Sequence, residues 1–254
     1  MTAKYKTKAF VLKKSDRNES DRIFSVFTDE FGKLNIFAKA IRKSTSKLRS
    51  GIDIFFMSEI EFIQGKNRKT LTDTSIVKKF SSISKDVKKF QIANGIGEIL
   101  DNFIKGEERD KGVFDLLDEV FCELNSQNST TGKHTLLYYY FLWNALSIFG
   151  YLPEVEKCNS CHNKLSPDIF YFSNILGGVI CEKCLGHDVS AKKININSVK
   201  LLRLIFKKEW KLLSKLKIDS VSKSLFKKMS DDYYMYTLST HSFKNISRVS
   251  AEVV

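Results

Sequence analysis

Residues 157–185, KCNSCHNKLSPDIFYFSNILGGVICEKCL, contain two C-x-x-C pairs separated by an apolar segment. Cys158 and Cys161 form the first pair, and Cys181 and Cys184 form the second. The intervening IFYFSNILGGVI has two adjacent glycines between apolar runs, a pattern that predicts a β-hairpin. Two knuckles joined by a hairpin bring four thiolates around one tetrahedral ion, the geometry and ligand set that zinc prefers. This stretch therefore predicts a zinc ribbon.

Other cofactors use parts of the same pattern. CNSCH, which ends at His162, is also an attachment sequence for c-type haem, but haem would leave Cys181 and Cys184 without a role. A redox dithiol usually occurs once and beside a βαβ unit, whereas this motif occurs twice. An iron–sulfur cluster also takes four thiolates, and His162 or His187 replacing one thiolate is a further alternative. We predict one structural Zn²⁺, because a closed four-cysteine site leaves no position for substrate or water.

The segments on both sides of the cysteine region have helical periodicity. Residues 134–153, HTLLYYYFLWNALSIFGYLP, are apolar around the whole circumference and predict a buried central helix that Gly150 and Pro153 end. The fifth cysteine, Cys122, lies beside an apolar helical face and is predicted to be buried. The cysteine region is thus predicted to interrupt a helical bundle. The other helices are predicted at residues 85–104, 112–125, 197–216 and 222–238.

The first 80 residues instead have the composition of short strands. Five segments rich in β-branched and aromatic residues, DRIFSVFT and KLNIFAKAIR among them, alternate with turn segments such as SDRNESD and QGKNRK. Five strands in about 75 residues fit a small antiparallel barrel, most commonly an OB fold. The predicted fold class is α+β and multidomain: an N-terminal OB-fold β-barrel, then an α-helical bundle with an inserted four-Cys zinc ribbon. The predicted domains are residues 1–80 (OB fold), 81–152 (helical, first part), 153–188 (zinc ribbon) and 189–254 (helical, second part).

The charge balance indicates the kind of partner. The chain has 42 Lys and Arg against 29 Asp and Glu, a formal net charge of +13. Such an excess points to a polyanion, either nucleic acid or an anionic membrane surface. No apolar run approaches the roughly 18 residues that span a bilayer, and residues 1–16 are too charged for a secretory signal. We therefore expect a cytoplasmic, nucleoid-associated protein with no membrane partner.

The most concentrated basic segment is residues 33–50, KLNIFAKAIRKSTSKLRS, which has no acidic residue. Strand alternation places Leu34 and Ile36 on one face and Phe37 among the cations of the other. A face that mixes cations with an aromatic ring holds phosphates while a base stacks on the ring. Packing of Phe37 beneath the following helices is the alternative. The predicted DNA-binding residues are Lys33, Phe37, Lys39, Arg42, Lys43, Lys47 and Arg49.

A second basic run lies on the helix predicted at residues 197–216. We expect it to be a solvated helix face, with a further DNA path or a dock for an acidic peptide as alternatives. The run comprises Lys200, Arg203, Lys207, Lys208, Lys211, Lys215 and Lys217.

No catalytic motif is evident. The sequence has no Walker A loop, no H-E-x-x-H and no G-x-S-x-G, and its acidic residues are scattered. We predict a protein that is not an enzyme. The rival predictions are a metal-dependent nucleic-acid enzyme whose acidic residues meet only in three dimensions, and a zinc-ribbon accessory factor that binds RNA or polymerase.

Together these features resemble the bacterial RecO family of DNA repair and recombination mediators over essentially the whole chain. Residues 8–55, with E-x-x-R-I-x-x-x-x-T-x-x-x-G at 19–32, are similar to that family's barrel, and residues 150–184 are similar to its zinc region. The resemblance implies binding of single- and double-stranded DNA, annealing of complementary strands, and action with RecR in the RecFOR pathway. It further implies loading of RecA onto DNA coated with single-strand-binding protein, whose acidic C-terminal tail is engaged. DNA contacts carried over from the family fall on residues 33–50.

Overall fold

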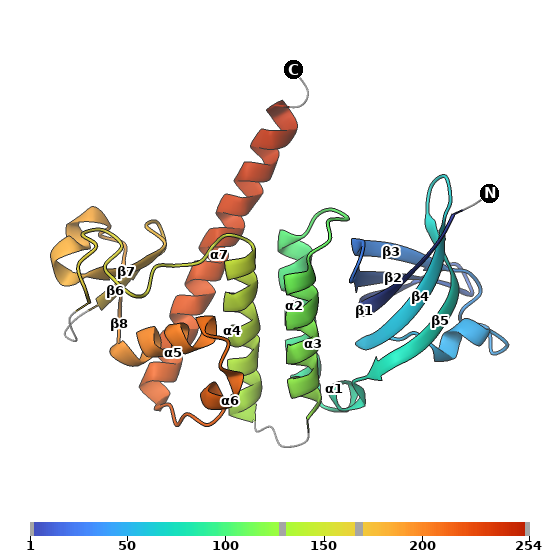
Figure 1. Cartoon of the computed structure of the whole chain (residues 1–254), viewed down its shortest axis with the longest axis horizontal. Coiled ribbons are helices and arrows are strands. Elements are labelled where there is room, and N and C mark those ends of the chain that lie inside the picture. Colours follow the sequence, from blue (N-terminus) through green and yellow to red (C-terminus); the bar gives the residue numbers. More distant parts are fainter. Residues whose placement is uncertain (1–2, 127–130, 166–169, 252–254) are drawn as a thin grey trace. The chain divides into compact units, whose positions relative to one another are not determined.

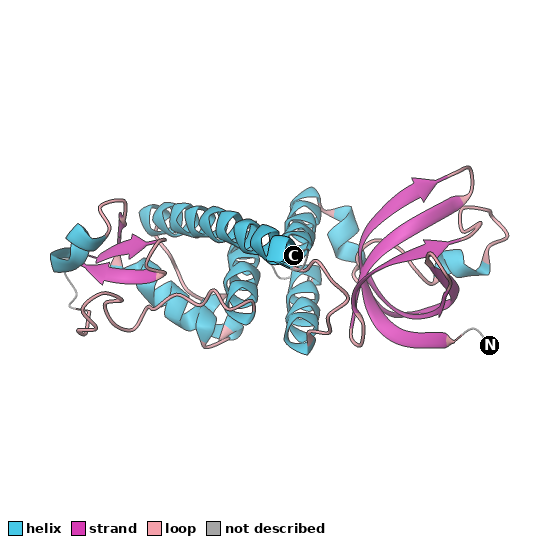
Figure 2. Ribbon diagram, turned by 90° about the horizontal axis from the view of Figure 1, so that it is seen from above, coloured by secondary structure: helices cyan, strands magenta, loops and turns pink. Residues whose placement is uncertain are grey.

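The computed structural model describes residues 3–126, 131–165 and 170–251, and the chain divides into two compact units, residues 1–138 and 139–254 (Figure 1). The first unit begins with a closed five-stranded barrel in the order β1-β2-β3-β5-β4, which Figure 2 shows curving round on itself. Its pairings are antiparallel except for a short parallel contact between β3 and β5. The predicted OB fold is confirmed. The strands are β1 (Lys4–Arg17), β2 (Asp21–Thr28), β3 (Gly32–Ala38), β4 (Phe56–Gln64) and β5 (Lys69–Lys79).

Alternation along the strands fills the barrel. Phe24 and Val26 of β2, and Leu34 and Ile36 of β3, are buried in one apolar cluster, as a period of two requires. β3 ends at Ala38, earlier than the predicted strand, because the chain turns at Ala40 with a positive φ of 53°. The inward residues therefore fix the register, and the intervening residues of β3 face outward.

The outer face of β1 is covered by helices. Phe10 is fully buried, and its ring centroid lies 5.2 Å from that of Phe114 and 5.6 Å from that of Phe121. These contacts explain why β1 is apolar on both faces near Phe10. The helices are α1 (Ser81–Lys85), α2 (Val87–Phe103) and α3 (Lys111–Asn125).

Two helical expectations in this region need correction. The helix predicted from residue 85 breaks at Asp86, whose carboxylate accepts from the Lys88 and Lys89 N–H groups and starts α2 there. Cys122 is exposed rather than buried. Its thiol lies 3.7 Å from Lys78 Nζ and 3.6 Å from an Asp118 oxygen, because it sits one position past the core residue Phe121.

The loop between α2 and α3 lies against the β2–β3 turn. Gly32 has a φ of +62°, and a Cβ at this position would overlap the Glu108 backbone. Arg109 Nε donates to Asp29 O at 3.0 Å, and Lys33 Nζ donates to Ile104 O at 3.5 Å. These contacts hold residues 104–109 beside the barrel as the wall of a cleft described below.

The second unit is built around the part of α4 (Thr131–Ile148) that follows Tyr138. Trp143 is fully buried, stacks on Tyr233 with centroids 5.1 Å apart, and donates from Nε1 to Ser230 Oγ at 2.9 Å. Gly150, with φ +85°, ends the helix, and Tyr151 N–H bonds back to Leu146 O at 2.8 Å. The predicted buried helix and its glycine stop are therefore present.

The helix predicted at residues 197–216 is broken into α5 (Ile196–Phe206) and α6 (Trp210–Leu213). Lys208 has a positive φ of 56°, and the turn brings Trp210 onto Tyr140, with ring centroids 5.4 Å apart. α7 (Ser220–Ala251) follows. Among the described helices, none combines the length and the apolar character that crossing a bilayer needs.

A small sheet carries the cysteine region. β6 (Phe170–Ser173) pairs antiparallel with β7 (Gly178–Cys181) and with β8 (Lys192–Ile194). Gly177, with φ +69°, is in the β6–β7 turn, and the Gly178 backbone pairs with Glu154. The predicted hairpin thus forms, although Ile169, its first predicted residue, lies outside the described residues.

Candidate nucleic-acid interface and metal centre

A cleft of about 600 Å³ lies on the outer face of the barrel beside β3. Its floor includes Asn35 and Phe37 of β3, which point outward because Leu34 and Ile36 point into the core. Its walls come from the β1–β2 turn, the β4–β5 loop and the α2–α3 loop. In OB folds, the face of strands 2 and 3 and the loops 1–2 and 4–5 bind oligonucleotides and oligosaccharides. The cleft therefore occupies the position where this fold holds polymers.

Some of the cleft's cations are already neutralised. Lys33 Nζ lies 2.5 Å from Asp101 Oδ1, and Lys69 Nζ lies 2.5 Å from Glu107 Oε1. Lys13 also binds Asp101. Burial raises the pKa of Asp101, but the hydrogen bonds from Lys13 and Lys33 outweigh burial and hold the pKa below its ordinary value. Lys33 therefore faces the cleft with its charge partly offset, because it shares the Asp101 carboxylate with Lys13.

Three other cations line the cleft and form no direct ion pair with a described residue: Arg17, Arg68 and Lys105. Lys105 Nζ donates to the Asp101 carbonyl at 2.8 Å, a contact that leaves its charge uncompensated. The Arg68 guanidinium lies over the Phe37 ring, 3.9 Å from its centroid. Phe37 is accordingly only 8% exposed, so its ring face is covered by Arg68 rather than open to solvent.

The rest of the predicted interface forms a loop beyond β3. Ala40 N–H bonds to Asp21 Oδ1 at 2.8 Å, and Ile41 and Leu48 pack on the barrel core, which anchors this loop at both ends. Arg42 Nη1 lies 3.5 Å from Asp16 Oδ2. The remaining four cations are exposed and form no ion pair with a described residue: Lys39, Lys43, Lys47 and Arg49.

The structure thus separates the predicted residues into two groups. Lys33 and Phe37 line the cleft, whereas the five cations from residue 39 onward lie on the following loop. Reasoning from the sequence missed Arg17, Arg68, Lys69 and Lys105. Two of them, Arg68 and Lys69, lie in the basic turn QGKNRK, which joins strands 4 and 5 of the predicted OB barrel. Because the loop between strands 4 and 5 binds ligands in that fold, this turn was the signal that could have identified them.

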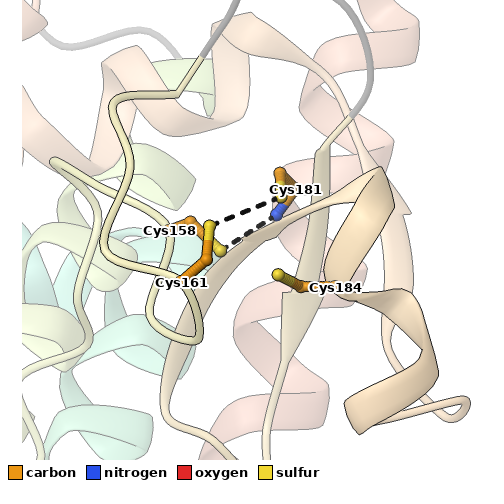
Figure 3. A group of neighbouring side chains, drawn as sticks. All are labelled: Cys158, Cys161, Cys181 and Cys184. Carbon is orange, nitrogen blue, oxygen red and sulfur yellow. Dashed lines mark hydrogen bonds between the residues drawn. The ribbon is translucent and has the colours of Figure 1, made fainter.

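The four cysteines of the second unit converge, as Figure 3 shows. Their sulfur atoms all lie within 4.8 Å of one another, and Cys161 Sγ is 3.9 Å from Cys181 Sγ. Cys181 N–H donates to Cys158 Sγ at 3.4 Å. Cys158 and Cys161 come from the loop before β6, Cys181 ends β7, and Cys184 lies in the turn that follows.

The cluster fits a metal ion chemically. A tetrahedral ion with metal–sulfur bonds of about 2.3 Å needs sulfurs about 3.8 Å apart, close to the Cys161–Cys181 separation. Burial raises the pKa of Cys158, but N–H groups of Cys161, Cys181 and Ser160 outweigh it and lower the pKa to about 6. The Ser160 hydroxyl lowers the pKa of Cys184, yet burial and the neighbouring sulfurs raise it to about 12. A metal bound by all four sulfurs must therefore displace protons.

Family models match both parts of the chain. Residues 1–80 match the model described as "Recombination protein O N terminal", and residues 84–245 match "Recombination protein O C terminal".

Curated proteins are similar over most of the chain. "DNA repair protein RecO" of Dehalococcoides mccartyi strain BAV1 is 33% identical over 215 residues, which are 85% of this chain and 83% of the relative. Proteins of the same name from Caldanaerobacter subterraneus subsp. tengcongensis and Alkaliphilus metalliredigens are each 27% identical. The first of these two similarities covers 90% of both chains, and the second covers 95% of this chain and 96% of the relative.

Proposed function

Because the chain belongs to the RecO family of DNA repair proteins, we propose that it is a recombination mediator that binds single- and double-stranded DNA. In this proposal it anneals complementary strands and, with RecR, loads RecA onto DNA coated with single-strand-binding protein. The proposed role is binding and positioning, without catalysis. The observation that carries the proposal is the cleft and adjoining basic loop on the oligonucleotide-binding face of an OB barrel.

The charge of this face supports phosphate binding. Arg17, Arg68 and Lys105 in the cleft, and Lys39, Lys43, Lys47 and Arg49 of the loop, form no direct ion pair with a described residue. Each can replace a counterion condensed on DNA, which makes binding tight at low salt and independent of sequence. β3 joins the two groups, because its residues line the cleft and the basic loop begins where it ends.

Annealing follows from the same charge. Two complementary strands repel each other through their phosphates, and a surface with cations on both a cleft and a neighbouring loop lowers that repulsion. Because phosphates carry no sequence information, base pairing alone decides which strands combine. The proposed interface has two parts, the cleft and the basic loop. Lys33 and Phe37 belong to the floor of the cleft. The loop provides the predicted Lys39, Arg42, Lys43, Lys47 and Arg49.

A different surface suits the acidic tail of single-strand-binding protein. On the second unit, Leu212 is 46% exposed and Leu216 is 41% exposed. Lys211, Lys215 and Lys217, which alternate with them, are exposed and unpaired within the described residues. Apolar side chains among lysines complement a peptide that has both carboxylates and apolar residues. We assign the proposed tail contact to this surface.

The four-cysteine site is proposed to hold one structural Zn²⁺. The ion would be bound by Cys158, Cys161, Cys181 and Cys184 and would join β7 to the loop before β6. In the proposed domain organisation, residues 1–80 bind DNA and residues 153–188 form a ribbon between the helical parts 81–152 and 189–254. This organisation differs from the two compact units because α1–α3 pack on the barrel.

The proposal is tested by annealing of complementary oligonucleotides with and without single-strand-binding protein. We expect the protein to accelerate annealing in both conditions. The same reactions are run with Mg²⁺ or Mn²⁺ and gel analysis of the strands. Absence of annealing contradicts the proposal, and strand cleavage with turnover supports the rival assignment as a metal-dependent enzyme.

A further inference from the structure

We propose that the cleft beside β3 binds an unpaired nucleobase, which stacks on the Arg68 guanidinium while side-chain amides contact its edge. The inference rests on the proposed function and adds to it: the cleft contacts bases, whereas the basic loop of residues 39–49 contacts phosphates.

Arg68 provides a fixed stacking surface. One face of its guanidinium lies on the Phe37 ring, 3.9 Å from the centroid, and the residue is exposed to solvent. The backbone positions both groups, since Arg68 O accepts from Gly65 N–H at 3.0 Å and Phe37 pairs with Thr70 of β5. Nucleobases stack on planar guanidinium groups as well as on aromatic rings. The stacking surface of this barrel is therefore Arg68, and Phe37 supports it from beneath.

Side-chain amides surround this surface. Asn18, Asn35, Gln64 and Asn67 all line the cleft. Asn35 and Asn67 are exposed and form no side-chain hydrogen bond with a described residue. An interface for phosphates alone needs only cations and N–H donors, whereas an amide offers a donor and an acceptor together, as base edges do.

The size and rim of the cleft suit an unpaired base within a strand. Its volume of about 600 Å³ is in the range of pockets that enclose small ligands. Arg17 and Lys105, which also line it, can bind the phosphates on either side of an inserted base. In a duplex the bases are stacked and paired, so their faces and edges are occupied. The cleft should therefore discriminate single strands from duplexes.

The test compares two oligonucleotides of equal length and charge, one of thymidines and one with abasic residues at internal positions. Fluorescence anisotropy measures the dissociation constant of each. Stacking of one base corresponds to roughly fivefold or more in affinity, so we expect the intact strand to bind at least about fivefold more tightly. R68K should bring this ratio close to one, because lysine keeps the charge and still covers Phe37 but lacks the plane. The matched variant K43A/K47A should weaken both strands and leave the ratio unchanged.

The outcomes separate the two levels of the proposal. Equal binding of intact and abasic strands by the unaltered protein overturns the inference and leaves the proposed function in place. A full preference for the intact strand in R68K overturns the assignment of Arg68. Failure to bind either strand overturns the proposed function and this inference with it.

Discussion

Removing the unpaired cations of the basic loop should reduce the salt dependence of DNA binding by a calculable amount. Lys39, Lys43, Lys47 and Arg49 are exposed and unpaired among the described residues, and three further unpaired cations line the cleft. Single-stranded DNA contributes a log–log slope of about −0.7 per phosphate contact, so seven contacts give about −5 and three give about −2. Between about 50 and about 200 mM salt, the unaltered protein should lose about 900-fold in affinity and the quadruple alanine variant about 20-fold.

The assay is anisotropy of a labelled single strand over that salt range, with thermal unfolding followed in parallel. Each substitution should change the free energy of unfolding by at most about 0.5 kcal/mol, because these side chains are exposed and make no ion pair. K85A/K88A is the control, since both lysines are exposed near the start of α2, about 25 Å along the helix from Lys105. A slope near −5 in the quadruple variant, or an equal effect of the control, would refute the assignment.

Three further outcomes are expected from substitutions elsewhere. Replacing Cys158 and Cys181 with Ser should release metal, which a chromogenic chelator measures, and should lower the melting temperature. Annealing, which we assign to the barrel, should decrease less than the stability does. Gly32→Ala should cost about 2 kcal/mol or more in urea unfolding because of its positive φ and backbone overlap, whereas Gly97→Ala, with nothing within 4 Å, should not destabilise. Asp101→Asn should steepen the salt slope, because it removes the single carboxylate that Lys13 and Lys33 share. The pKa of Asp101 is lower in the folded protein than in the unfolded chain, so the ionised carboxylate stabilises the fold above about pH 3.8. This stabilisation is lost as the pH falls through the folded pKa. The free energy of unfolding of the Asn variant should lack this decrease at acid pH.

The sequence predicts the barrel well because buried apolar residues alternate with outward-facing residues along its strands. In β2 and β3 every second side chain lies in one core, and the sequence itself shows this period of two. β1 departs from it, because Phe10 and Leu12 are buried on the outer face although Ala9 and Val11 already point into the core. That second burial depends on helices that follow more than sixty residues later, which no local pattern of β1 encodes.

The four-cysteine cluster is predicted more completely than the proposed DNA-binding face. All four metal-site cysteines are adjacent in two short motifs, and the structure brings their sulfurs together as the spacing indicates. The cleft, by contrast, combines five segments between Arg17 and Glu107, of which the predicted site includes only β3. The neutralisation of Lys33 by Asp101 joins residues 68 positions apart, so the basic composition of residues 33–50 overstates its free charge.

The break between α5 and α6 shows that a tertiary contact can interrupt a helix that the sequence predicts as continuous. Residues 207–209, Lys-Lys-Glu, include no glycine or proline, so the apolar periodicity around them predicts one helix. The left-handed conformation of Lys208 is held by burial of Trp210 against Tyr140, a tertiary contact that outweighs local helix propensity.

The central claim is that the barrel face binds DNA, and photo-crosslinking tests it most directly. A single strand containing 5-iodouridine is irradiated with the full-length protein, and the crosslinked peptides are identified by mass spectrometry. We predict crosslinks within residues 15–23, 33–49 and 64–69. Crosslinks confined to the lysine-rich helices of residues 196–217 would contradict the claim.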